Sequence, residues 1–142
     1  MQLPCLFLQI RKADRQLNQL YGKYLGRNGM RITQYGLLRA IDGLEEPSIT
    51  EIGRVLGIDQ TTVTRNVEKL ENMGLVACTQ AQADSRKKIV RLTALGADRL
   101  AAAHPEWEKA QQRMISGLGD DDVQELLRLM LKVSRIAEKD SA

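Results

Sequence analysis

Residues 60–69 combine hydroxyl, amide and cationic side chains along one side of a predicted helix. At about 100° per residue, Val63, Val67 and Leu70 share a single face, which must pack on a core. Away from that face, threonines suit phosphates, base edges or a thymine methyl, and arginine suits guanine through two hydrogen bonds. This chemistry fits a DNA major groove, and a solvated helix face is the alternative. The side chains concerned are Gln60, Thr61, Thr62, Thr64, Arg65 and Lys69.

Three consecutive cations follow between two strand-like runs. Arg86, Lys87 and Lys88 would repel one another at the tip of a hairpin, and a phosphate backbone would supply the missing counter-charge. Arginine also fits the negative potential of a narrow minor groove. Asp84 can fix the direction of Arg86 through a charge-assisted hydrogen bond. The alternative is a charged hairpin that keeps an edge strand from pairing with other chains.

Four predicted helices and two predicted strands position these side chains. Apolar residues spaced by three or four predict a helix over 3–25, and Thr33 is the expected N-cap of a helix over 34–44. Ser48 opens a capping-box pattern that starts a third helix, which Gly57 ends after about two turns. The fourth helix is expected from residue 59 or 60 to 73, with Gly74 as its stop. Strands are expected at 75–80 and 86–93, joined by more than a two-residue turn.

Helices are also predicted beyond the second strand. Thr93 can cap a helix that runs to Met114, although Pro105 should kink or interrupt it. Asp120 to Asp122 favour the start of a last helix because acidic side chains complement the helix dipole. The predicted fold is therefore mainly α with a small β-wing. Residues 1–30 are expected to form an N-terminal dimerisation helix, 31–93 a winged helix-turn-helix module, and 94–142 C-terminal dimerisation helices.

Apolar stripes on the first and last helices predict a homodimer. The winged helix-turn-helix core is small and both helices are long, so we expect each apolar stripe to be buried against a second copy of the chain. Two-fold symmetry would present two recognition helices to a pseudo-palindromic duplex, with half-sites about 34 Å apart.

Composition narrows the possible classes of protein. The chain has 142 residues, a net charge of +3 and 4% aromatic residues, which argues against binding of single strands through stacked bases. Positive charge lies in the first two thirds, since residues 94–142 carry seven Lys and Arg against nine Asp and Glu. Two cysteines are too few for a disulfide framework, and no apolar run approaches a membrane span. We therefore expect a cytoplasmic protein without membrane association.

The sequence shows no constellation of residues typical of an enzyme. It holds no Ser-His-Asp set, no phosphate-cradling glycine loop and no paired carboxylates, and its single histidine makes a histidine-based metal site improbable. We expect no enzymatic activity, no cofactor and no metal. The alternative to a DNA-binding regulator is a winged-helix adaptor that binds proteins and lacks specific DNA binding.

Several segments resemble the multiple antibiotic resistance regulator (MarR) family of bacterial and archaeal transcription factors, and the resemblance covers nearly the whole chain. The segments are residues 49–58, 61–65 and 70–76, then Asp84-Ser85-Arg86 followed by Val90-Arg91-Leu92-Thr93. The resemblance implies a homodimer with interlocked terminal helices, a fourth helix in the major groove, and Arg86 in the minor groove. It also implies a repressor with a small-molecule or redox trigger near the junction of the dimer and DNA modules.

Cys5 is a candidate redox sensor by the same resemblance. An oxidation-sensing branch of the family uses a reactive cysteine of the N-terminal helix near tyrosines, and Tyr21, Tyr24 and Tyr35 are candidates here. In that branch the cysteine lies about two positions later, where this chain has Phe7. The alternative is that Cys5 is a small buried apolar residue.

Overall fold

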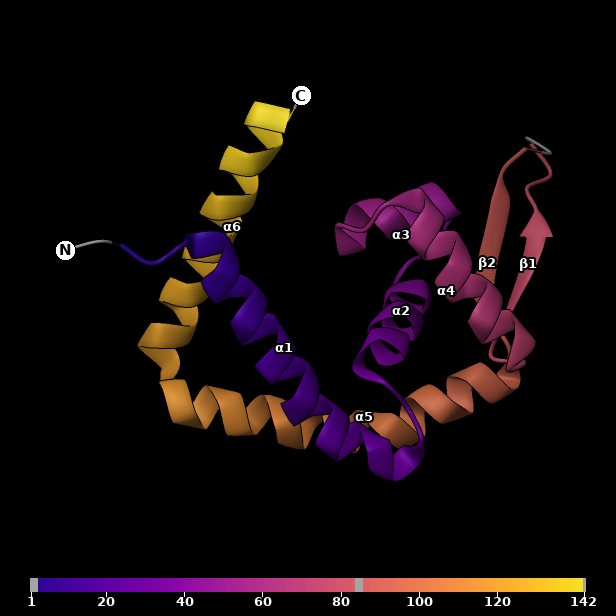
Figure 1. Ribbon diagram of the computed structural model, residues 1–142. Helices are drawn as coiled ribbons and strands as arrows, with labels where there is room; N and C mark the ends of the chain where they lie inside the picture. The colour runs from indigo at the N-terminus through magenta and orange to yellow at the C-terminus, as the bar shows by residue number, and fades with distance from the viewer. Residues whose placement is uncertain (1–2, 84–85, 142) are drawn as a thin grey trace. The chain divides into compact units, whose positions relative to one another are not determined.

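A computed structural model describes residues 3–83 and 86–141 (Figure 1). The chain divides into two compact units, residues 1–107 and residues 108–142. The elements are α1 Leu6–Leu25, the 3-10 helix η1 Gly26–Asn28, α2 Ile32–Gly43, α3 Ile49–Leu56, α4 Gln60–Asn72, β1 Val76–Gln80, β2 Lys88–Leu92, α5 Ala94–Leu118 and α6 Asp120–Ser141. The prediction of a mainly helical fold with a small β-wing is confirmed.

The ends of α3 and α4 follow the predicted capping chemistry. The Ser48 hydroxyl accepts a hydrogen bond from the backbone N–H of Glu51 at 3.2 Å, and Gly57 ends α3 in the left-handed region with φ 66°. The Asp59 carboxylate accepts from the backbone N–H of Thr62 at 2.7 Å and starts α4. Short polar caps on both sides of the turn therefore fix where each helix begins.

The predicted start of α2 and the interruption allowed for at Pro105 were wrong, whereas the alternative of a kink at Pro105 stays a prediction. Helix α2 begins at Ile32, so its N-cap is Arg31 and Thr33 lies inside the first turn. The backbone N–H of Arg31 donates to the Gln34 side chain at 3.0 Å, so the helix start is capped by a side chain inside the helix and not by a hydroxyl before it. Helix α5 is not interrupted at Pro105. A proline removes one helical hydrogen bond, and the surrounding bonds of a 25-residue helix keep it continuous.

The two strands form an antiparallel ribbon beside α4 (Figure 1). Their register pairs Val76 with Leu92 and Gln80 with Lys88, so residues 81–87 make the connection. The predicted long turn is confirmed. On the other edge of β2, the backbone N–H of Val90 donates to the carbonyl of Pro47 at 2.9 Å. This bond ties the wing to the segment that leads into α3.

A hydrophobic core joins α2, α3, α4 and both strands within residues 1–107. Val63, Val67 and Leu70 are buried, which confirms the predicted inner face of α4. They pack in one cluster with residues of the other elements, among them Tyr35, Leu38, Ile41, Ile52, Leu75 and Val90. Because the core holds one side of α4, its opposite side is left on the surface.

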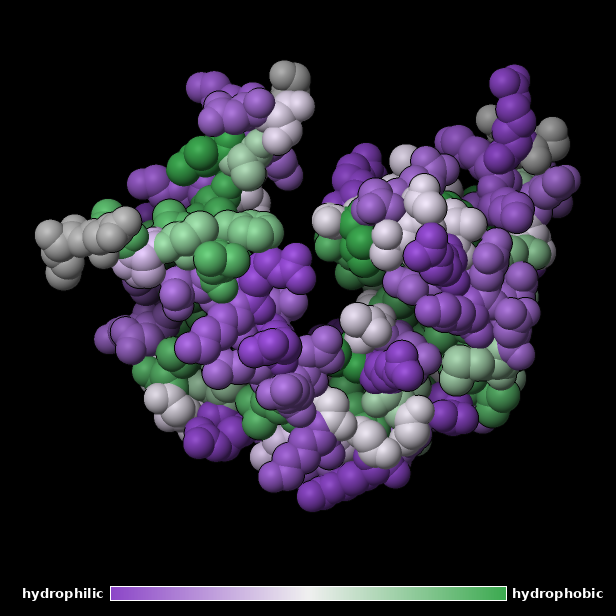
Figure 2. Space-filling model, in the orientation of Figure 1, coloured by the Kyte–Doolittle hydropathy of each residue, from purple (hydrophilic) through white to green (hydrophobic). Residues whose placement is uncertain are grey.

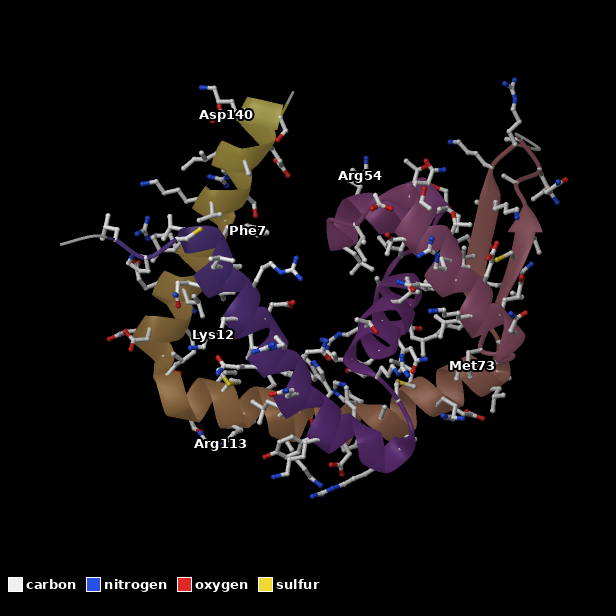
Figure 3. All side chains as sticks on the ribbon, viewed as in Figure 1. Phe7, Lys12, Arg54, Met73, Arg113 and Asp140 are labelled. Carbon is white, nitrogen blue, oxygen red and sulfur yellow. The ribbon has the colours of Figure 1, made fainter. Side chains whose placement is uncertain are left out.

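Large apolar side chains remain exposed on α1 and on α6. Near the start of α1 the exposed fraction reaches 73% for Leu6 and 63% for Phe7, the residue labelled in Figure 3. On α6, exposed apolar side chains include Leu127, Leu131 and Ile136. Green, hydrophobic residues are visible on both helices in Figure 2. Neither these helices nor any other in the described ranges is long and apolar enough to cross a membrane.

Candidate nucleic-acid interface

The turn between α3 and α4 is held by a close approach of two backbones. The backbone N–H of Ile58 donates to the carbonyl of Gly53 at 3.0 Å. A Cβ at Gly53 would lie 2.8 Å from the Ile58 carbonyl oxygen and 3.4 Å from a Val63 methyl. Glycine therefore allows the two helices of the helix-turn-helix to pack at this distance, and this sets the direction of α4.

The outer side of α4 carries most of the polar side chains predicted to contact DNA. Gln60, Thr61 and Arg65 are exposed, and Thr64 is half-buried. Lys69 is exposed too, but it lines a small hollow toward α2. Thr62 is half-buried as well, but it lines an inner cavity on the other side of the helix. A shallow hollow on the outer side is lined by Gln60, Thr61, Thr64, Arg65 and Glu68.

The wing brings its cations to a second hollow beside α4. Lys88 is the first residue of β2, and Arg86 and Lys87 precede it with exposed side chains. The hollow has a volume of about 520 Å³ and lies between α3, α4 and the strands. Its lining includes Arg54, Gln60, Thr64, Arg86, Lys87 and Lys88. Arg54 is labelled on α3 in Figure 3, and Figure 2 shows hydrophilic residues over this face. Asp84 lies outside the described residues.

Two groups near this face have shifted pKa values, Asp59 through a hydrogen bond and Cys78 mainly through burial. The backbone N–H of Thr62 bonds to the Asp59 carboxylate and lowers its pKa, so this cap is ionised at neutral pH. Burial, reinforced by the nearby Glu71 carboxylate, raises the pKa of the Cys78 thiol to about 11. The same carboxylate accepts from the backbone N–H of Cys78 at 3.2 Å and thereby links α4 to β1. Cys78 is therefore an uncharged packing residue near pH 7.

An inner cavity of about 540 Å³ lies between α1, α2, α3 and α4, on the side of α4 opposite the outer hollow. Its lining is mainly apolar with a few amides and hydroxyls, and burial raises the pKa of Tyr21 in its wall. Sequence reasoning missed this cavity, because its lining comes from five separate helices and forms no local motif. The lining includes Asp14, Leu17, Tyr21, Leu37, Asn66 and Trp107.

A stacked cluster backs one wall of the cavity. The Tyr35 ring stacks on Trp107, with ring centroids 5.6 Å apart, and its hydroxyl lies 2.8 Å from Nδ1 of His104. The Arg39 guanidinium lies 4.2 Å from the centre of the Trp107 ring and donates to the Tyr35 hydroxyl at 3.3 Å. Helix α2 is thus joined to the first part of α5 through polar and aromatic contacts that no sequence motif indicated.

The predicted redox residue, Cys5, is a free cysteine with an exposed side chain just before α1. Tyr21 follows it by 16 residues on the same helix, a separation of about 24 Å along the axis at ~1.5 Å per residue. The two side chains therefore do not meet within one protomer. In the described parts of the chain, no group of three or more His, Cys, Asp and Glu side chains is placed to hold a metal.

Comparison with known proteins matches the same elements. The MarR family model matches residues 28–87. The transcriptional regulator MOSR of M. tuberculosis, crystallised in complex with DNA, is 32% identical, with 96% of this chain and 98% of that chain covered and a TM-score of 0.87.

A cysteine-to-serine mutant of MarR from E. coli, complexed with operator DNA, is 26% identical, with a TM-score of 0.82 over 90% of this chain and 92% of that chain. The transcriptional regulator HosA of Escherichia coli is 29% identical over 86% of this chain and 94% of its own length. These relatives are transcriptional regulators, so the comparisons favour the DNA-binding regulator over the protein-interaction adaptor. Together with the winged helix-turn-helix, these similarities show that the chain belongs to the MarR family of DNA-binding transcriptional regulators.

Proposed function

We propose that the protein is a cytoplasmic homodimeric repressor that binds a pseudo-palindromic duplex through α4 and the wing. One observation carries the proposal: the outer polar side of α4 and the cations at residues 86–88 border a single hollow. When α4 lies in the major groove, the wing lies over the adjacent sugar-phosphate backbone of the DNA. From there Arg86 can enter the neighbouring minor groove. The solved structures of MOSR and of the MarR mutant with DNA support this mode of binding.

The exposed apolar side chains of α1 and α6 support the homodimer. Leaving large residues such as Leu6, Phe7 and Leu127 in water costs about 1.5–3 kcal/mol each relative to full burial. Large apolar side chains left exposed along a helix mark an interaction site. A second copy supplies the same two helices, so residues 1–30 and 94–142 would serve dimerisation. Sedimentation of the full chain tests the dimer, and a monomer at micromolar concentration would contradict it.

The inner cavity is our candidate effector site. It has room for a small organic molecule, and Val63, Thr62 and Asn66 in its wall belong to α4. A ligand that enlarges or reshapes the cavity would change how α4 sits relative to α1 and α2, and hence the presentation of its outer side. The single tryptophan, Trp107, also lines the cavity, so quenching of its fluorescence reports ligand binding without DNA.

Oxidation of Cys5 is the second candidate trigger. Its exposure permits access of peroxide, and Tyr21 or Tyr24 of a partner protomer would have to complete such a site, because Tyr35 is buried in the stacked cluster. Mild peroxide should lower DNA affinity, and Cys5→Ser should abolish that response while binding to DNA is retained. A Cys5→Ser protein that still responds to peroxide would remove Cys5 from the account.

The DNA-binding proposal is tested by selection from random duplexes followed by fluorescence anisotropy. We expect tight binding to the selected sequence, weaker binding by Arg86→Ala, and a salt dependence shallower by about one unit of slope per protomer. Changes at Thr61, Thr64 or Arg65 should alter the preferred sequence. Arg135→Ala on α6 removes the same charge outside α4 and the wing, and once sedimentation shows that this variant is still a dimer it should change neither. Equal binding of all duplexes, with capture of a protein partner instead, would favour the adaptor function.

A further inference from the structure

Glu68 lies in a row of side chains at the outer side of α4. Gln60, Thr64 and Glu68 are four residues apart, and all three line both the outer hollow and the hollow beside the wing. Glu68 itself is exposed. From residue 60 to residue 68 the helix rises about 12 Å at ~1.5 Å per residue, which equals three to four base-pair steps of ~3.4 Å. The row can therefore follow several successive base pairs.

The Glu68 carboxylate has no partner of its own in the part of the chain that the structure describes. No hydrogen bond or ion pair joins it to residues 3–83 or 86–141. Two other glutamates differ in this respect, because Glu71 accepts from the backbone N–H of Cys78 and Glu125 pairs with Arg128. An uncompensated carboxylate would be costly to desolvate in an interface unless the ligand supplies a donor.

Duplex DNA offers few donors to such a group. An ionised carboxylate only accepts hydrogen bonds, and phosphates repel it. In the major groove the donors are the N4 amino group of cytosine and the N6 amino group of adenine. In adenine the N7 acceptor lies beside N6, so the lone pair of N7 would face the second carboxylate oxygen and repel it. Cytosine presents its amino group without this neighbour, so it is the better partner.

We propose that Glu68 is a specificity-determining residue that accepts a hydrogen bond from the N4 amino group of one cytosine in each half-site. The inference rests on the proposed binding of α4 in the major groove. Gln60 and Thr64, which precede Glu68 in the same row, would contact the neighbouring base pairs. The acidic side chain thus adds selectivity at one base pair, beside wing lysines that would contact the phosphates of any sequence.

The test compares wild type with Glu68→Gln on the selected duplex and on a set with each base pair of one half-site replaced. Competition anisotropy should show that wild type prefers cytosine at one position by about tenfold, which corresponds to ~1.4 kcal/mol. Glu68→Gln should prefer adenine at that same position, because an amide can bind N6 and N7 together. Glu45→Gln, the same change at an exposed position between α2 and α3 that lines neither hollow, should keep the cytosine preference.

Each other outcome overturns the inference. If Glu68→Gln binds every duplex more tightly by the same factor, the carboxylate acts only through repulsion of phosphates. If its preference equals that of wild type at every position, Glu68 remains in solvent. In both cases wild type still selects a sequence, so the proposed function stands and only the role of Glu68 fails. A wild type without any preference would instead overturn the proposed function as well. Circular dichroism of Glu68→Gln checks that the exposed change leaves the fold intact.

Discussion

Substituting the glycine at the helix-turn-helix contact should destabilise the protein and misplace the recognition helix. In Gly53→Ala the added methyl group would lie 2.8 Å from the Ile58 carbonyl oxygen and 3.4 Å from a Val63 methyl. In a helix, alanine raises the free energy of unfolding by about 0.5–1 kcal/mol relative to glycine. Accommodating a methyl group at such short distances lowers it by about 1–3 kcal/mol. The balance is a loss of up to about 2.5 kcal/mol in the free energy of unfolding.

Gly36→Ala in α2 is the matched control, because its added Cβ meets no atom within 4 Å. Its free energy of unfolding should rise by about 0.5–1 kcal/mol, because alanine favours the helix and meets no clash. The free energies of unfolding of the two variants should therefore differ by about 1–3 kcal/mol. Urea unfolding followed by circular dichroism at equal protein concentration measures both, since a dimer's stability depends on concentration. We also expect weaker DNA binding by Gly53→Ala. The reasoning is refuted if Gly53→Ala is as stable as Gly36→Ala and binds DNA as tightly as wild type.

Three further predictions concern caps and thiols. Ser48→Ala should lose about 1 kcal/mol of stability, because α3 loses its N-cap hydrogen bond, and urea unfolding checks this. The raised pKa of Cys78, about 11, keeps its thiol protonated, so iodoacetamide at pH 7.5 should alkylate exposed Cys5 first and Cys78 only as the pH approaches 11. Peptide mass spectrometry follows both sites, and rapid alkylation of Cys78 at pH 7.5 would contradict a half-buried thiol with a raised pKa. The hydrogen bond from Thr62 lowers the pKa of Asp59, so this cap stabilises the fold above the usual pKa of an aspartate and loses that effect as the pH falls through the lowered value. Asp59→Asn keeps a capping oxygen and should show a smaller loss of stability in that acidic range, which acid titration by circular dichroism measures.

The DNA-facing elements were predictable because their signals are local. The Ser48 and Asp59 caps, the glycine stops and the period of Val63, Val67 and Leu70 each depend on residues within a few positions. Those signals give the boundaries of α3 and α4 and, from the buried face, the side of α4 that remains on the surface. The resemblance to the MarR family lies in these segments and in those of the wing.

The inner cavity and the stacked cluster were not predictable, since both depend on contacts between elements distant in the sequence. Tyr35 and His104 are 69 positions apart, and neither residue has a neighbour that indicates their hydrogen bond. The start of α2 was misplaced because the side chain that caps it belongs to Gln34, inside the helix, whereas the search favoured a hydroxyl before it. Pro105 was weighed as a local helix breaker, although a long helix tolerates the loss of a single hydrogen bond.

Hydroxyl-radical footprinting of the selected duplex tests the central claim most directly, because it shows where the protein touches the backbone. The account predicts two symmetric protected regions about one helical turn (~34 Å) apart, flanked by minor-groove protection from the wings. Arg86→Ala should lose the flanking protection and keep the central pair. Protection of a single unsymmetrical stretch, or flanking protection that Arg86→Ala leaves intact, would contradict a dimer that binds through α4 and the wing.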